Sequence, residues 1–153
     1  MINTKIITKG GSKLRNQLRK TAKSQNRSIH SVEVGFYSSA RYPNGEYVTN
    51  VAAWNEFGTS TSPPRPYFRN ANIQMRPLIK HYLSQAIDPT KMVVDKSMGG
   101  KMGQIMRNTL ITSITKLRNP PNAPSTLERK FPKTNPLINT GKMRTSVTYK
   151  VNS

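Results

Sequence analysis

The sequence predicts a single α+β domain in which a small, mainly antiparallel sheet packs against three to four helices, one of them long. Two short segments, one in each half of the chain, alternate apolar and polar residues, so we expect an N-terminal and a C-terminal strand to pair. Between them, apolar residues recur at helical spacing. The length of 153 residues fits one domain, since single domains typically have about 100 to 150 residues.

The first 31 residues combine a β-branched run with a strongly basic helical pattern. Residues 5–8 favour an edge strand, and residues 10–12 supply a break and an N-cap. A helix is predicted over residues 13–25, with one narrow apolar stripe. Its positive side chains are candidate contacts to phosphates or to an acidic partner, unless they only form a solvated face: Lys13, Arg15, Arg19, Lys20 and Lys23.

The first internal strand and the helix after it follow from clear periodicities. Residues 32–37 alternate with period two, which indicates a strand with one buried face. Residues 42–45 are typical of a turn. Residues 48–57 have helical spacing, and Gly58 stands where a left-handed C-terminal cap belongs.

Residues 54–69, which we call the proline corner, join this helix to the next through a stiff connector. The prolines in it fix backbone φ angles and withhold N–H donors, and the residue before each proline is pushed toward extended geometry. We therefore expect the corner to hold two helices at a set angle. Its marker residues are Trp54, Glu56, Phe57, Gly58, Pro63, Pro64, Arg65, Pro66 and Arg69.

Two residues of the proline corner allow more than one interpretation. Glu56 is its only acid, and an ion pair with Arg65 or Arg69 that braces the corner is favoured over a role facing a partner. Trp54 is expected to fill either the core or an interface.

Two further helices complete the predicted helical part. The first covers residues 67–87, and Pro77 should kink it. Its apolar face is formed by Ala71, Met75, Leu78, Ile79, Tyr82, Leu83 and Ala86. The second runs from Asp88 to Leu117 and is expected to be weakened or broken at residues 99–103, where glycines either give flexibility or permit a close helix contact.

The last part of the chain is expected to return to the sheet. Residues 119–140 predict a long Pro-rich loop with at most a turn near residues 126–130, and such loops are usually functional or flexible. Residues 145–151 then alternate with period two and should pair with the strand near residue 32.

Composition narrows the possible functions. The formal net charge is +19, which implies a polyanion or an acidic protein as partner. Hydrophobic residues make up 34%, so the core is expected to be thin and some apolar surface to be buried only against neighbouring subunits. No signal peptide or membrane-spanning run is present, which predicts a soluble product of the cytoplasm.

Reactive groups are sparse. The chain has two histidines, no cysteine and six acids, which are scattered through the sequence. No catalytic constellation, metal site, cofactor motif or phosphate loop can be assembled from them, so we expect no enzyme activity and no cofactor.

Three separated blocks resemble one protein family. The blocks are "VAAWNEFGTSTSPPRPYFR" from Val51, "PPNAPSTLERK" from Pro120 and "NPLINTGKMRTSVTY" from Asn135. In the same order they are similar to the tail-completion proteins, also called neck or head–tail joining proteins, of long-tailed double-stranded DNA phages. Together they cover most of the chain from residue 32 onward. In the later blocks the resemblance falls on Pro120, Pro121, Pro124, Arg129, Lys130 and Gly141.

The resemblance implies a structural virion subunit that forms a homo-oligomeric ring, by family habit a hexamer, at the head–tail junction. Its partners would be copies of itself, the adjacent neck, head-closure and tail proteins, and double-stranded DNA that passes without sequence reading. The rival interpretation is a stand-alone basic protein that binds nucleic acid independently of sequence. A catalytic tail accessory protein would need an active-site cluster that this sequence lacks.

Overall fold

A computed structural model of the chain describes residues 16, 31–37, 39–86 and 96–152. The predicted strand over residues 5–8 and the predicted helix over residues 13–25, with Lys13, Arg15, Arg19, Lys20 and Lys23, therefore lie outside the described ranges. The described elements are β1 (Ser31–Gly35), α2 (Val48–Phe57), α3 (Tyr67–Ala86), α4 (Lys96–Lys116), α5 (Pro124–Lys130), α6 (Lys142–Thr145) and β2 (Thr148–Asn152).

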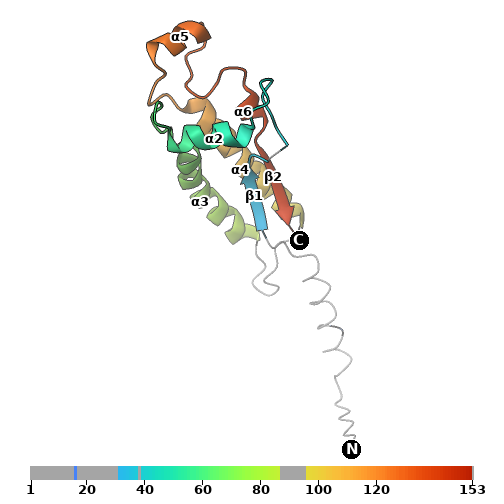
Figure 1. Cartoon of the computed structure of the whole chain (residues 1–153). Helices are drawn as coiled ribbons and strands as arrows, with labels where there is room; N and C mark the ends of the chain where they lie inside the picture. The colour runs from blue at the N-terminus through green and yellow to red at the C-terminus, as the bar shows by residue number, and fades with distance from the viewer. Residues whose placement is uncertain (1–15, 17–30, 38, 87–95, 153) are drawn as a thin grey trace, which may run out of the picture.

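The two predicted strands pair, which confirms the α+β class. β1 and β2 form a two-stranded antiparallel sheet, in register from Ser31 opposite Asn152 to Gly35 opposite Thr148. Both strands lie against α4, and Figure 1 shows them side by side in front of it. The end of β1 meets the start of α3, where the rings of Phe36 and Tyr67 pack edge to face with centroids 6.3 Å apart.

The core lies where α2, α3 and α4 meet. Tyr67, Ala71 and Met75 of α3 are buried at four-residue steps against Leu110 and Ile114 of α4. This stripe continues to the partly buried Ile79, so Leu78, which was predicted on the buried face, falls at its edge and is 47% exposed.

α4 corrects the prediction of a weakened or broken helix at the glycines. The helix runs without interruption through Gly99, Gly100 and Gly103. Gly103 serves a close contact instead, because a Cβ built on it would lie 2.2 Å from Cδ2 of Tyr149 in β2. The small residue lets the sheet, rather than another helix, approach α4. The predicted start of this helix at Asp88 lies outside the described residues.

The C-terminal third is more regular than predicted. Residues 119–140 do not form one extended loop, because they contain α5, with Pro124 in the first helical positions where its missing N–H costs nothing. A second short helix, α6, follows Gly141, whose φ of 82° is in the left-handed region. β2 consequently begins at Thr148 and not at Thr145.

Gly103 and Gly100 offer a matched pair for testing this packing. Gly103→Ala should lower the free energy of unfolding by about 1–3 kcal/mol, because its methyl group overlaps the Tyr149 ring. Gly100→Ala meets nothing within 4 Å and should raise the free energy of unfolding by about 0.5–1 kcal/mol through helix propensity. Urea unfolding followed by circular dichroism measures both. Equal effects in the two variants would contradict the close contact.

Candidate functional site

Within the proline corner, the residue that follows α2 is a glycine that no other residue can replace without strain. Gly58 follows α2 with φ 79° and ψ 177°, and its N–H donates to the Trp54 carbonyl at 2.9 Å. The positive φ confirms the prediction, but ψ shows that the residue is not a left-handed cap. It occupies an extended mirror region that is essentially restricted to glycine. A Cβ there would also lie 2.9 Å from the backbone of Ser62 and Pro64, so the chain folds tightly back at this point.

Glu56 is buried at the corner and caps the next helix. Only 7% of it is exposed, and its carboxylate accepts the backbone N–H groups of Phe68 at 2.7 Å and Arg69 at 3.1 Å. These donors belong to the first turn of α3, where N–H groups have no partner within the helix and the helix dipole attracts negative charge. The predicted ion pair with Arg65 or Arg69 is therefore wrong, because Glu56 is committed to backbone donors.

Arg65 is the second buried charge at the corner, and it reaches a distant segment. It is 7% exposed, and its guanidinium donates to the carbonyls of Pro120 and Pro121, each at 3.1 Å, and to Oδ1 of Asn122 at 3.3 Å. Burial lowers the pKa of Arg65 from its ordinary value. Its own backbone N–H donates to the Asn55 carbonyl at 2.7 Å, so the same residue ties the corner to α2.

Two further side-chain hydrogen bonds connect distant segments to the end of α4. Ser113 donates to the Tyr67 carbonyl at 2.7 Å, which fixes the start of α3. Asn135 donates to the Thr115 carbonyl at 2.8 Å, while its Oδ1 accepts the N–H groups of Leu137 and Ile138. The first sequence block, which is about fifty residues away from the other two in the chain, therefore meets them around the last turns of α4.

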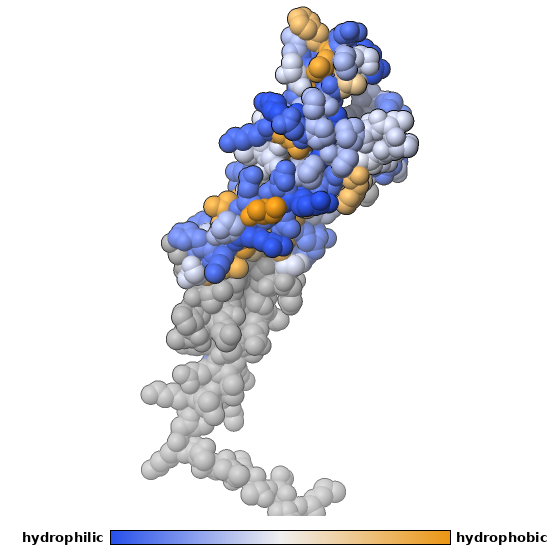
Figure 2. Space-filling model, turned by 90° about the vertical axis from the view of Figure 1, so that its left-hand side faces the viewer, coloured by the Kyte–Doolittle hydropathy of each residue, from blue (hydrophilic) through white to orange (hydrophobic). Residues whose placement is uncertain are grey.

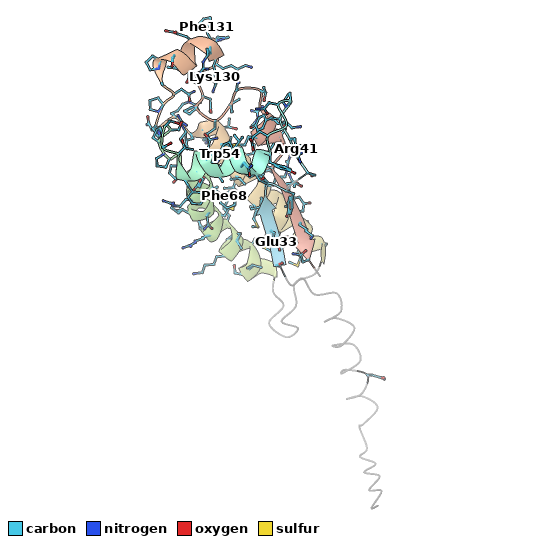
Figure 3. The ribbon with its side chains drawn as sticks, viewed as in Figure 1. Glu33, Arg41, Trp54, Phe68, Lys130 and Phe131 are labelled. Carbon is cyan, nitrogen blue, oxygen red and sulfur yellow. The ribbon has the colours of Figure 1, made fainter. Side chains whose placement is uncertain are left out.

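A projecting segment leaves this junction, and we call residues 120–134 the α5 arm. α5 buries none of its residues and packs against no other described helix or strand. Figure 3 shows Phe131 at the far end of the arm and Lys130 between it and α2. Two lysines connect the end of the arm to the residues that follow it. Lys130 donates to the Asn135 carbonyl and Lys133 to the Asn139 carbonyl, each at 2.8 Å.

Several large apolar side chains are exposed outside the core. The exposed fractions are 48% for Trp54, 72% for Phe57, 63% for Ile73 and 85% for Phe131. Trp54 therefore does not fill the core, and its role in an interface stays a prediction. Figure 2 shows apolar surface set among hydrophilic groups, including at the end where α5 lies.

Two surface hollows flank the proline corner. One, of about 490 Å³, lies between α2 and α3 and is lined by rings such as Phe36, Phe57 and Phe68. The other, of about 430 Å³, lies between the turn at residues 42–46 and residues 136–143. Within the described ranges, no three acidic or histidine side chains are placed to share a metal ion.

The remaining marker residues divide between support and surface. Pro63, Pro64, Pro121, Pro124, Arg69 and Arg129 are exposed, and Pro66, Pro120, Lys130 and Gly141 are partly buried. Sequence reasoning missed Ser113, Asn122 and Asn135, which carry the connections between blocks. Of these three residues, only Asn135 lies in a sequence pattern that predicts a structural role, because an Asn before a proline favours a turn.

No protein-family model, curated protein or solved structure matches this chain. In the part of the chain that the structure describes, no helix has the length and apolar character needed to cross a membrane.

Removing the cap on α3 should weaken the whole junction. We expect Glu56→Gln to lower the free energy of unfolding by about 1–3 kcal/mol, because Gln keeps one acceptor oxygen and places an NH2 donor opposite the other backbone N–H group. Thermal unfolding by calorimetry is the measurement. Glu128→Gln, which changes an exposed glutamate on α5, should stay within about 0.5 kcal/mol. If Glu56→Gln behaves like that control, the cap has no stabilising role.

Releasing the guanidinium should free the α5 arm. Arg65→Ala removes three hydrogen bonds to residues 120–122 and should cost about 2–3 kcal/mol of stability. Tryptic cleavage after Arg129, Lys130 and Lys133 should become faster in this variant than in the wild type. Arg69→Ala, at an exposed side chain, serves as the matched control. Unchanged cleavage in Arg65→Ala would show that the hydrogen bonds of the Arg65 guanidinium do not hold the arm.

Proposed function

We propose that this chain is a neck, or tail-completion, subunit of a long-tailed double-stranded DNA phage. It forms a ring at the head–tail junction, joins the tail to the DNA-filled head and surrounds the DNA passage. It acts in the virion after assembly in the host cytoplasm. It performs no chemistry, and its partners are its own copies, the neighbouring ring proteins and DNA.

One observation carries this proposal. The three blocks on which the family resemblance rests are joined around the end of α4 by Arg65, Ser113 and Asn135. Residues that are distant in the sequence thus serve one structural unit, which is what a shared fold requires of them. A resemblance caused by local composition would give no reason for these contacts.

The surface supports an assembly role over a catalytic one. The side chains of Trp54, Phe57, Ile73 and Phe131 are exposed in the single chain, and aromatic residues are enriched in protein interfaces. Single exposed apolar residues are common, but here they accompany a projecting arm with no packing of its own.

The second candidate is a stand-alone nucleic-acid-binding protein, and the net charge of +19 favours it. Such a protein would bind duplex DNA strongly at low salt, and its affinity would fall steeply with salt as counterions are released. If the chain is a neck subunit, we expect the free chain to bind DNA weakly, because only some of its basic side chains face DNA and the others contact acidic neighbouring proteins.

The two candidates differ in assembly. Purified protein should be examined by light scattering and negative-stain imaging, alone and with tails from a phage that lacks this gene. We expect rings at the tail end after mixing, and tails that become competent to join heads. A chain that stays monomeric in both conditions, leaves tail ends bare and binds a short duplex tightly would favour the nucleic-acid-binding candidate instead.

A further inference from the structure

The far end of the α5 arm presents one aromatic side chain without any cover. Phe131 is 85% exposed directly after α5, the highest value among the large exposed apolar residues. Leu127, four residues earlier, is only partly buried. Phe131 follows Lys130, the last residue of α5, so Leu127 and Phe131 place two apolar residues at this end of the arm, and we call them its apolar face.

This face is held in place without packing beneath it. A seven-residue helix is not stable by itself in water, and α5 buries no residue against the rest of the chain. The arm is fixed at its ends instead, by Arg65 on residues 120–122 and by Lys130 and Lys133 on the carbonyls of Asn135 and Asn139. An element held rigid from its ends loses little entropy when it binds a partner.

The residues next to Phe131 in the sequence are mostly basic. Arg129, Lys130 and Lys133 flank Phe131, and Glu128 is the one acid on the arm. Their hydrogen bonds in the described structure go to carbonyl and hydroxyl oxygens, not to carboxylates. The pKa of Lys130 is lowered by burial and then by the nearby charges of Arg65 and Lys133, so these cations repel one another.

We propose that the α5 arm is a docking element for an acidic protein surface with an apolar hollow, on the ring protein that adjoins this one in the neck. Phe131 enters the hollow, and the neighbouring basic side chains pair with carboxylates at its rim. The inference rests on the proposed function and names the kind of partner that the arm requires.

A second copy of this chain fits the arm less well. The hollow between α2 and α3 is rimmed by Arg69, and its acid, Glu56, is committed to the cap on α3. The other hollow is lined by Lys130 and Lys142, with Glu46 already bonded to Asn50. The basic arm would therefore meet further positive charge on a copy of itself.

Duplex DNA does not account for the exposed aromatic side chain. Sequence-independent binding to a duplex is carried by phosphate contacts from basic side chains, to which Phe131 contributes nothing. Removing the aromatic ring should therefore weaken binding to a protein partner but not binding to DNA, which distinguishes the two kinds of partner. An aromatic anchor at the centre of an interface typically contributes a factor of about 10 to 100 in Kd.

The experiment compares Phe131→Ala and Arg129→Glu with Leu78→Ala and Lys101→Glu, which change an exposed apolar side chain on α3 and an exposed lysine on α4. Each full-length variant is first checked for wild-type thermal unfolding. Binding is then measured to purified tails, and separately to DNA-filled heads, from a phage that lacks this gene. Self-association is followed by light scattering, and binding to a short DNA duplex by a salt titration.

We expect the two arm variants to weaken binding to heads or to tails by about 10- to 100-fold, with self-association and duplex binding unchanged and both control variants like wild type. Wild-type binding by the arm variants would overturn the docking role while leaving the proposed function intact. Loss of self-association would assign the arm to a second copy, and loss of duplex binding would assign it to DNA, and either result overturns the inference. If the wild-type chain binds neither heads nor tails, the proposed function fails and the inference fails with it.

Discussion

Two buried charges of opposite sign determine the geometry of this protein, and each is satisfied by backbone groups instead of by the other. Glu56 accepts N–H groups at the start of α3, and Arg65 donates to carbonyls of Pro120 and Pro121. Burying a charge is costly unless hydrogen bonds replace its hydration. Because each charge has a fixed set of backbone partners, each also fixes the position of a segment. Glu56 sets α3 against α2, and Arg65 sets the base of the α5 arm against the corner.

This arrangement has a consequence for the surface. An ion pair between Glu56 and a basic residue would have cancelled one charge of each sign at the corner. The observed contacts instead remove a carboxylate from the surface, where acids are already few. The corner and the arm are left with exposed basic side chains such as Arg69 and Arg129, and each also exposes an aromatic side chain, Phe57 and Phe131 respectively. A surface of this kind favours association with negatively charged partners that also offer apolar contacts.

Periodicity in the sequence was sufficient for the sheet and the core helices. The two strands, α2 and α3 follow from local apolar spacing, which also indicates most of the buried face of α3, although Leu78 is exposed. The errors concern contacts between distant segments. The need for a small residue at Gly103 of α4 arises from Tyr149 across the fold, and α5 is maintained by contacts at its ends and not by an apolar stripe. The acceptors of Arg65 lie more than fifty positions away, and no local rule selects them over Glu56.

The net charge bears directly on how such a chain could form a ring. Copies that each carry +19 repel one another at short distance, and the apolar side chains exposed here are too scattered to offset that repulsion alone. A ring built from them gains stability when negative charge is brought to it, either by phosphates in its centre or by carboxylates on the rings above and below. Assembly would then be coupled to the presence of the correct neighbours, because the free chains remain apart until the opposing charge arrives. In the proposed ring, electrostatic repulsion between copies would thereby provide an order of assembly that requires no conformational switch.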